Sequence, residues 1–314
     1  MNNKIVLIGC GNVGMAYAYA LLNQKTCVDK LVLIDINKDN TVGQAMDLNH
    51  CLSYSPSKIE VISGEYSDCK DAKIVVIAAG ANQAVGETRM DLINKNSFIF
   101  KNIINNVMKS GFDGIFLIAS NPLDVMTYLT LKYSKLPPNR VIGSGTTLDT
   151  SRLRYLISTK VNINPENIDA YVIGEHGDSE FVPWSTVSIG LSKIHNFLTY
   201  EEQQEIEKEV KNSAYEIIKK KGVTCYGIGM CLVKITNAIL EDQKIILPVS
   251  SYDKNNELCI STPAIVGSSG VKEKIFIPLT LDEEAKLTKS INIIKEAIKS
   301  INYSNEKLNF RVTE

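Results

Sequence analysis

The first 35 residues of this 314-residue chain constrain its fold more than any other stretch. A short apolar, β-branched run over 4–8 leads directly into Gly9-Cys10-Gly11-Asn12-Val13-Gly14. A helical pattern covers 15–23, and a second apolar run over 31–34 ends in Asp35. A G-x-G-x-x-G sequence alone is a weak signal. A strand before it, a helix after it and an acid about 20 residues further on make it specific for a dinucleotide-binding βαβ unit.

The glycine loop and Asp35 divide the expected binding between them. The glycines permit a tight turn and let the backbone approach a pyrophosphate at the helix N-terminus. Asp35 can accept hydrogen bonds from a ribose diol and would repel a 2′-phosphate, which favours NAD over NADP. The alternative is a glycine-rich turn followed by an ordinary strand-end aspartate. The cofactor-binding residues expected from this unit are Gly9, Gly11, Asn12, Val13, Gly14 and Asp35.

Strands and helices keep alternating as far as residue 143. This order predicts an α/β fold, a Rossmann-type doubly wound parallel sheet covered on both faces. Ligands of such sheets bind outside the carboxyl ends of the strands, where Gly80, Asn121 and Ser144 fall. The expected strands are 58–63, 73–78, 114–119 and 140–143, and the expected helices are 40–52, 90–109 and 123–131.

The segment 80–89 joins a buried strand to a long helix at this ligand-binding edge. Its glycines and polar residues suit a lid that closes over a substrate and excludes water. Arg89, near its end, would then polarise a carbonyl group in a medium of low dielectric constant. The alternative is an exposed arginine on the first turn of a helix.

The segment 148–156 predicts a helix on which Asp149 and Arg152 share a face. Arg152 presents a planar fork that can hold a substrate carboxylate through two parallel hydrogen bonds. Asp149 can reach an imidazole, orient it and favour its protonated form. The alternative is an ion pair on the surface of a helix.

That imidazole is expected to be His176, which lies between Gly174 and Gly177 with carboxylates on both sides. The apolar run 170–173 before it predicts a buried strand, so His176 would follow a strand end. Histidine can both give and take a proton near neutral pH, as a general acid and base must. The alternative is a hydrogen-bonded structural histidine.

The remainder of the chain predicts an α+β catalytic domain with antiparallel strands. We therefore expect two domains, 1–143 for cofactor binding and 144–314 for the substrate and catalysis. The expected helices of the second domain after 148–156 are 198–221, 226–240 and 281–301, and its expected strands are 245–249, 258–262, 264–266 and 274–277.

Composition excludes several classes of function. Hydrophobic content of 44% and charged content of 22% are those of a soluble globular protein, and a formal net charge of -1 gives no electrostatic case for nucleic acid or an anionic membrane. No apolar run approaches the roughly 20 residues that span a bilayer. The seven scattered cysteines lack a C-x-x-C pair, which favours reduced thiols in the cytoplasm and no metal site. The strand at Lys4 leaves no room for a signal peptide.

With these residues in place, the chain resembles the L-lactate and malate dehydrogenase family over essentially its whole length. The matching motifs are G-C-G-N-V-G at 9–14, A-G-A-N-Q-A-V-G-E-T-R at 79–89, S-N-P-L-D at 120–124, L-D-T-S-R at 148–152 and G-E-H-G-D at 174–178. The resemblance implies a homotetramer. It also implies that His176 and Asp149 form the proton-transfer pair, that Arg152 binds the substrate carboxylate, and that Arg89 polarises the reacting carbonyl. Further contacts implied for the substrate or NAD involve Asn121, Ser144, Ile228, Gly80, Ala81 and Asn82.

Substrate choice is expected to depend on Gln83. The matching lid position is arginine in malate dehydrogenases, where it pairs with a second carboxylate. Against neutral Gln83, oxaloacetate would bury an uncompensated charge, whereas the methyl group of pyruvate fits without that cost. Thr224 also resembles the lactate enzymes. The resemblance thus implies reversible reduction of pyruvate by NADH to L-lactate; a malate or broader 2-hydroxy acid dehydrogenase and a non-catalytic NAD sensor are the alternatives.

One departure concerns regulation. Bacterial members that fructose bisphosphate activates bind its phosphate with an arginine and a histidine. Arg154 matches the arginine, but Asp169 occupies the histidine position and should repel a phosphate. We expect weak activation or none.

Overall fold

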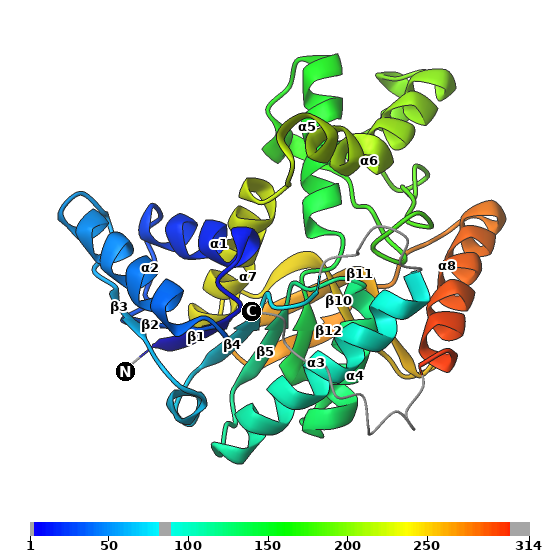
Figure 1. Cartoon of the computed structure of the whole chain (residues 1–314). Coiled ribbons are helices and arrows are strands. Elements are labelled where there is room, and N and C mark those ends of the chain that lie inside the picture. Colours follow the sequence, from blue (N-terminus) through cyan, green and yellow to red (C-terminus); the bar gives the residue numbers. More distant parts are fainter. Residues whose placement is uncertain (1–2, 82–88, 302–314) are drawn as a thin grey trace.

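The computed structural model describes residues 3–81 and 89–301, except for the side chain of Arg89. Its centre is a nine-stranded sheet with the strand order β12-β11-β10-β6-β5-β4-β1-β2-β3 (Figure 1). The strands from β6 to β3 pair in parallel, as the alternating sequence predicts. They are β1 (Lys4–Ile8), β2 (Lys30–Ile34), β3 (Glu60–Ser63), β4 (Ile74–Ile77), β5 (Ile115–Ile118) and β6 (Val141–Gly143).

Helices cover both faces of this parallel part, which explains why its strands are continuous apolar runs. On β1, Ile5 and Leu7 belong to the core under α1, α2 and α7, whereas Val6 and Ile8 belong to the core under α3 and α4. This alternation is the period of two of a strand with both faces buried. The helices are α1 (Asn12–Leu22), α2 (Lys38–His50), α3 (Arg89–Lys109), α4 (Leu123–Ser134) and α7 (Tyr226–Leu240).

Three antiparallel strands, β10 (Ile245–Asp253), β11 (Leu258–Gly267) and β12 (Gly270–Lys274), extend the same sheet beyond β6. The junction pairs Ser250 of β10 with Gly143 of β6. The predicted boundary at residue 143 therefore falls immediately after β6, and the sheet continues past it.

Two strand predictions in this region are wrong. Segments 258–262 and 264–266 form one strand, β11, because Pro263 lies opposite Pro248 and the two missing N–H groups fall at the same point of the ladder. The last strand ends at Lys274 and does not begin there.

A second layer lies over the carboxyl ends of the parallel strands. In Figure 1, α5 (Thr147–Val161) and α6 (Tyr200–Lys221) lie together above the sheet. They share an apolar core with the small antiparallel sheet β7 (Ile168–Asp169), β8 (Ser188–Ile189) and β9 (Ser192–Lys193). Helix α8 (Leu281–Lys299) packs on β11. Short 3-10 turns occupy Cys51–Ser53, Tyr66–Cys69, Pro138–Arg140, Pro165–Asn167 and Ile194–Asn196.

The strand expected over 170–173 is also wrong. Residues 170–172 are buried or half-buried but lie in no strand, and only Ile173 forms an isolated bridge, with Phe181. Helix α5 and its N-cap residue supply the missing partners: Thr150 accepts a hydrogen bond from the Val172 amide, and the N-cap Thr146 donates one to the Val172 carbonyl. Side chains thus satisfy a backbone that a neighbouring strand would otherwise pair.

None of the helices within residues 3–81 and 89–301 is long and apolar enough to cross a membrane.

Candidate active site

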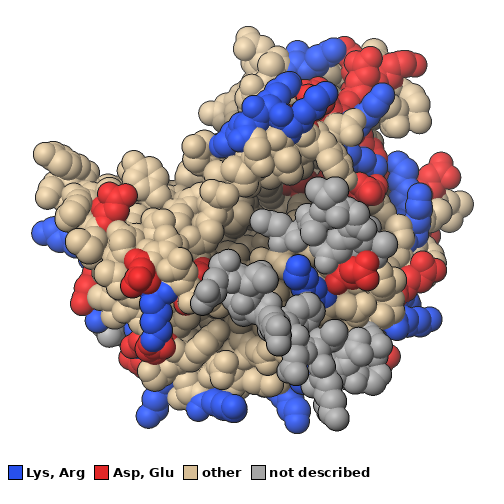
Figure 2. Space-filling view, viewed as in Figure 1, with Lys and Arg blue, Asp and Glu red and all other residues tan. Residues whose placement is uncertain are grey.

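The carboxyl ends of β1, β4, β5 and β6 face the layer that contains α5 and α6. Figure 2 shows that the molecular surface is hollowed between these two parts. The glycine loop after β1, residues 80–81 after β4, Asn121 after β5 and Ser144 after β6 all come from these strand ends. This is the edge at which the alternating sequence predicts ligand binding.

His176 is held in place through its backbone. Gly174 pairs with Ser261 of β11, and the His176 amide donates a hydrogen bond of 2.8 Å to Oδ2 of Asp124 on α4. Oδ1 of Asp124 accepts hydrogen bonds from Ser250 at 2.6 Å and Ser261 at 3.2 Å. Burial raises the pKa of Asp124 to about 6, although the Ser250 and His176 hydrogen bonds oppose this rise. The histidine loop is therefore attached to α4 and to two strands of the sheet.

The imidazole of His176 belongs to a chain of charged groups. Its Nδ1 donates a hydrogen bond of 2.7 Å to Oδ2 of Asp149, which is buried in the first turn of α5. Oδ1 of the same carboxylate accepts a hydrogen bond of 2.8 Å from Nη1 of Arg152. The predicted sharing of a face by Asp149 and Arg152 is thus observed, and Asp149 does reach His176.

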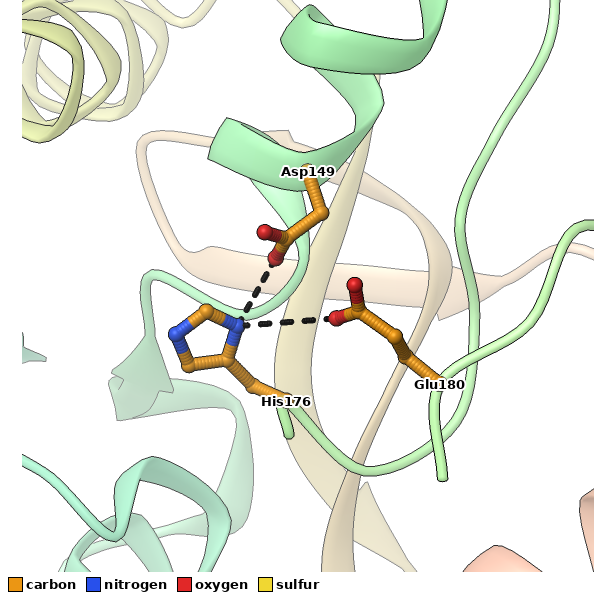
Figure 3. A group of neighbouring side chains, drawn as sticks. All are labelled: Asp149, His176 and Glu180. Carbon is orange, nitrogen blue, oxygen red and sulfur yellow. Dashed lines mark hydrogen bonds and ion pairs between the residues drawn. The ribbon is translucent and has the colours of Figure 1, made fainter. Parts of the chain in front are cut away.

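Glu180 is a second carboxyl group beside the same ring nitrogen. Its Oε2 lies 3.9 Å from Nδ1 of His176, and the residue is only 4% exposed. Figure 3 shows Asp149 and Glu180 both facing Nδ1, while the other ring nitrogen points away from them. That second nitrogen is the one able to exchange a proton with a ligand.

The potential ligand atoms of Asp149, His176 and Glu180 lie within 4.8 Å of one another, as they would in a metal site. Two of them are already committed, because Nδ1 bonds to Asp149 and the Asp149 carboxylate also pairs with Arg152. A metal ion would have to displace an existing hydrogen bond. The geometry therefore favours an ion-paired histidine.

The electrostatic balance of this group favours a charged imidazole. Burial lowers the pKa of His176, but the Asp149 carboxylate, assisted by Glu180 and Asp124, outweighs burial and raises that pKa to about 9. Burial also raises the pKa of Asp149, yet His176 and Arg152 together hold it below its usual value. Burial and the neighbouring Asp149 charge raise the pKa of Glu180 well above its usual value. At neutral pH an imidazolium therefore faces the Asp149 carboxylate.

The glycine loop fits a pyrophosphate. A Cβ on Gly9 would lie 2.5 Å from the Ala79 nitrogen, and one on Gly14 would overlap the Gly9 carbonyl, so the packing of the protein itself requires these two glycines. A Cβ on Gly11 would meet nothing within 4 Å. Gly11 is also the N-cap of α1, which has no side-chain cap and no acid in its first turn. The open space and the uncapped helix N-terminus together suit an anion.

Asp35 lies at the end of β2 beside this loop. Its Oδ2 accepts a hydrogen bond of 2.7 Å from the Cys10 amide, and its Oδ1 accepts one of 3.2 Å from the Asn37 amide. Each carboxylate oxygen retains a further lone pair that can accept a ribose hydroxyl. Asp35 thus both holds the glycine loop and suits a diol.

Sequence profiles of known families match nearly the whole chain. The lactate/malate dehydrogenase NAD binding domain matches residues 3–143, and the lactate/malate dehydrogenase alpha/beta C-terminal domain matches residues 146–304. The chain belongs to the lactate/malate dehydrogenase family.

Individual relatives agree with this membership. L-lactate dehydrogenase 1 of Bacillus cereus is 47% identical over 307 residues, which cover 94% of this chain and 97% of the relative. L-lactate dehydrogenase of Halalkalibacterium halodurans is 47% identical over 298 residues, with 94% and 96% covered. Among solved structures, a lactate dehydrogenase from a Medee basin deep-sea metagenome library has a TM-score of 0.94 at 45% identity, over 96% of this chain and 99% of that one. Ligand-bound minor L-lactate dehydrogenase of Enterococcus mundtii has a TM-score of 0.94 at 40% identity, over the same shares of the two chains. The resemblance seen in the sequence is confirmed.

Three of the other residues expected at the site lie at the ends of helices or strands around it, and three lie wholly or partly outside the described residues. Ser144 is buried after β6, Ile228 is half-buried on α7, and Thr224 is half-buried between α6 and α7. Arg89 begins α3, but its side chain lies outside the described residues. Asn82 and Gln83, with the rest of the expected lid up to residue 88, also lie outside them.

The two residues singled out for regulation come from α5 and β7. Nε of Arg154 donates a hydrogen bond of 3.1 Å to the Ala170 carbonyl, and its guanidinium lies 5.1 Å from the centre of the Tyr171 ring. Asp169 is exposed on β7.

Three buried polar residues of the site escaped the sequence analysis: Asp124, Glu180 and Asn96. Asn96 lies on α3 with Ile93 and Phe100 on its buried side, and it is 1% exposed. An amide within an otherwise apolar helical stripe was the signal that could have found it. Its partners are the loops after β4 and β5.

Proposed function

We propose that this chain is an NAD-dependent L-lactate dehydrogenase that interconverts pyruvate and L-lactate. The observation that carries the proposal is the hydrogen-bonded series His176–Asp149–Arg152. It joins a proton donor, His176, to a cation suited to binding a carboxylate, Arg152. A 2-keto acid presents a carbonyl group next to a carboxylate. The carbonyl group matches His176, and the carboxylate matches Arg152. The family membership and the L-lactate dehydrogenase relatives support the same activity.

Residues of the first 143 positions, together with Ser144 and Ile228, would hold NAD. The N-terminal amides of α1, with Gly11, face the pyrophosphate, and Asp35 accepts the ribose hydroxyls. When bound, NADH supplies the hydride that reduces the keto carbon. The remaining cofactor contacts proposed are Gly9, Asn12, Val13, Gly14, Gly80, Ala81, Asn82, Asn121, Ser144 and Ile228.

The chain's own residues provide orientation and the proton. Arg152 has five N–H donors, and its bond to Asp149 leaves others to hold the substrate carboxylate. His176 gives the proton on its outward nitrogen to the carbonyl oxygen while its Nδ1–H stays with Asp149. In lactate oxidation, neutral His176 takes the proton back. Arg89 polarises the carbonyl, and Asn121 positions it.

Neutral Gln83 sets the preference for a monocarboxylate. A second carboxylate against it would be buried without a counterion, which is expensive. Thr224 completes the substrate pocket. A homotetramer and a cytoplasmic location belong to the proposal as expectations from the family resemblance and the scattered cysteines.

The decisive test follows NADH oxidation by the purified protein with pyruvate and, separately, with oxaloacetate. We expect a kcat/KM ratio of about 100 or more in favour of pyruvate, equivalent to about 3 kcal/mol. A preference for oxaloacetate would contradict the Gln83 argument and favour malate dehydrogenase activity. Tight NADH binding without turnover of either substrate would favour a non-catalytic NAD sensor.

A further inference from the structure

The buried amide of Asn96 bridges two loops that end neighbouring strands. Its Oδ1 accepts a hydrogen bond of 2.8 Å from the Ala81 amide, after β4. Its Nδ2 donates one of 3.0 Å to the Asn121 carbonyl, after β5, and a longer one of 3.5 Å to the Ala81 carbonyl. One side chain from α3 therefore joins a cofactor-binding residue to a residue that contacts cofactor and substrate in the proposed function.

We propose that Asn96 is a positioning residue that fixes Asn121 relative to Ala81 so that cofactor and substrate meet in the reactive arrangement. This inference rests on the proposed function, because Ala81 and Asn121 have their roles there. Asn96 itself is buried on α3, with 1% of its surface exposed, so its side chain is not accessible to either ligand.

The chemistry of the bridge requires an amide. The Ala81 N–H needs an acceptor, while the carbonyls of Ala81 and Asn121 need donors, and a carboxamide offers both from one planar group. The loop packs directly on this amide, since a Cβ on Gly80 would be in ordinary van der Waals contact with Oδ1 of Asn96, at 3.4 Å. The hydroxyl of Ser120 donates a hydrogen bond to the Ala79 carbonyl and provides a separate link between the two strand ends.

Because of the Ser120 link, the loss of Asn96 should not separate the strands. Asn121 is exposed, so its carbonyl can turn toward water when its amide partner is removed. Loss of Asn96 should then cost little free energy of unfolding. Its larger effect should be on the orientation of Asn121. A misplacement of up to 1 Å lowers turnover by as much as about 100-fold.

Two variants separate the two halves of the bridge. Asn96→Asp keeps an acceptor for the Ala81 amide but places a carboxylate oxygen against the Asn121 carbonyl. Asn96→Ala removes every contact. Asn49 offers a matched control, because it clamps Val61 in the same manner: Nδ2 donates to the Val61 carbonyl at 2.7 Å, and Oδ1 accepts from the Val61 amide at 3.2 Å. Asn49 joins α2 to β3, and within residues 3–81 and 89–301 its side-chain hydrogen bonds all go to Val61.

The measurements are the NADH dissociation constant by fluorescence titration, kcat and KM for pyruvate, and the melting temperature. For Asn96→Asp we expect kcat to fall by about 10- to 100-fold, with NADH affinity retained. For Asn96→Ala we expect kcat and NADH affinity to fall together. Asn49→Asp and Asn49→Ala should lower the melting temperature comparably and leave kcat unchanged.

The proposal is overturned if the Asn96 variants keep wild-type kcat, or if the Asn49 variants lose as much kcat at equal loss of melting temperature. A failure of the proposed function is a different result, since the wild-type protein would then not prefer pyruvate. If it turned over oxaloacetate, the same four variants would be compared on that substrate. If it turned over neither, weaker NADH binding in Asn96→Ala than in Asn96→Asp would still support the bridge, and equal binding would refute it.

Discussion

Replacement of Asp149 by asparagine should move the pH range in which pyruvate is reduced. The rise in the pKa of His176 from its ordinary 6.5 to about 9 corresponds to about 3 kcal/mol in favour of the imidazolium. Burial lowers that pKa, and Asp149 is the strongest of the groups that raise it. Loss of the Asp149 charge should therefore bring the pKa of His176 down towards the ordinary value, while Glu180 and Asp124 still oppose burial. Below that value both enzymes hold the protonated form; between it and about 9 only the wild type does.

The size of the effect at neutral pH follows directly. With a pKa near 6.5, about a tenth of His176 carries its proton near pH 7.5, whereas nearly all of the wild type does. The kcat/KM for pyruvate should thus fall about tenfold near pH 7.5 and recover part of the loss near pH 5.5. Lactate oxidation by the wild type should show the opposite trend and rise as the pH passes about 9.

The assay is the pH profile of kcat/KM for pyruvate at saturating NADH, for the wild type and Asp149→Asn. Asp178→Asn serves as the control, because Asp178 is an exposed carboxylate on the same loop that accepts a hydrogen bond from Tyr215. The reasoning is refuted if Asp149→Asn loses activity by one constant factor at every pH while its alkaline limb stays near pH 9. Such a profile would assign Asp149 a purely structural role.

Three further predictions concern other parts of the chain. Gly11→Ala should weaken NADH binding with little change in melting temperature, whereas Gly14→Ala should lower the melting temperature because its Cβ overlaps a backbone carbonyl; equal behaviour in both assays would contradict the assigned difference. Glu180→Gln should lower the pKa of His176, seen as an alkaline limb at lower pH, but by less than loss of the paired aspartate, since the contact is longer. Fructose bisphosphate should leave the half-saturation for pyruvate nearly unchanged, and Asp169→His should introduce a response; a strong wild-type response would refute the repulsion argument.

The parallel part of the fold follows from local sequence patterns. Continuous apolar runs and the helices between them are properties of short segments, and helix α7 begins and ends at the expected residues, Tyr226 and Leu240. Contacts between residues far apart in the sequence do not follow from such local patterns. Nothing in the sequence near Ser250 indicates that β10 adds to β6, and nothing near Val172 indicates that hydroxyl groups of α5 satisfy its backbone.

The candidate site shows the same contrast between local sequence patterns and contacts of distant segments. His176, Asp149 and Arg152 carry distinctive chemistry at recognisable spacings, so the sequence identified them and the structure brings them together. Asn96 and Asp124 bind backbone groups of other segments. The sequence does not show which backbone N–H or carbonyl groups will lie near a given side chain. Apart from the S-N-P-L-D motif that contains Asp124, their signal was a polar side chain among apolar neighbours on a helix.

The continuous sheet has a consequence for protein engineering. Exchange of the cofactor-binding and substrate-binding halves between relatives is tempting, since a cut after Gly143 falls between two family domains. That cut divides a single sheet at the pairing of Gly143 with Ser250. A Cβ at Gly143 would overlap Thr127 and lie 2.9 Å from the Cβ of Ser250, and Ser250 in turn bonds to Asp124, which holds the His176 amide. A chimera joined at this position must therefore keep compatible residues where β6 pairs with β10. Otherwise His176 will be displaced even when every residue of the pocket is retained.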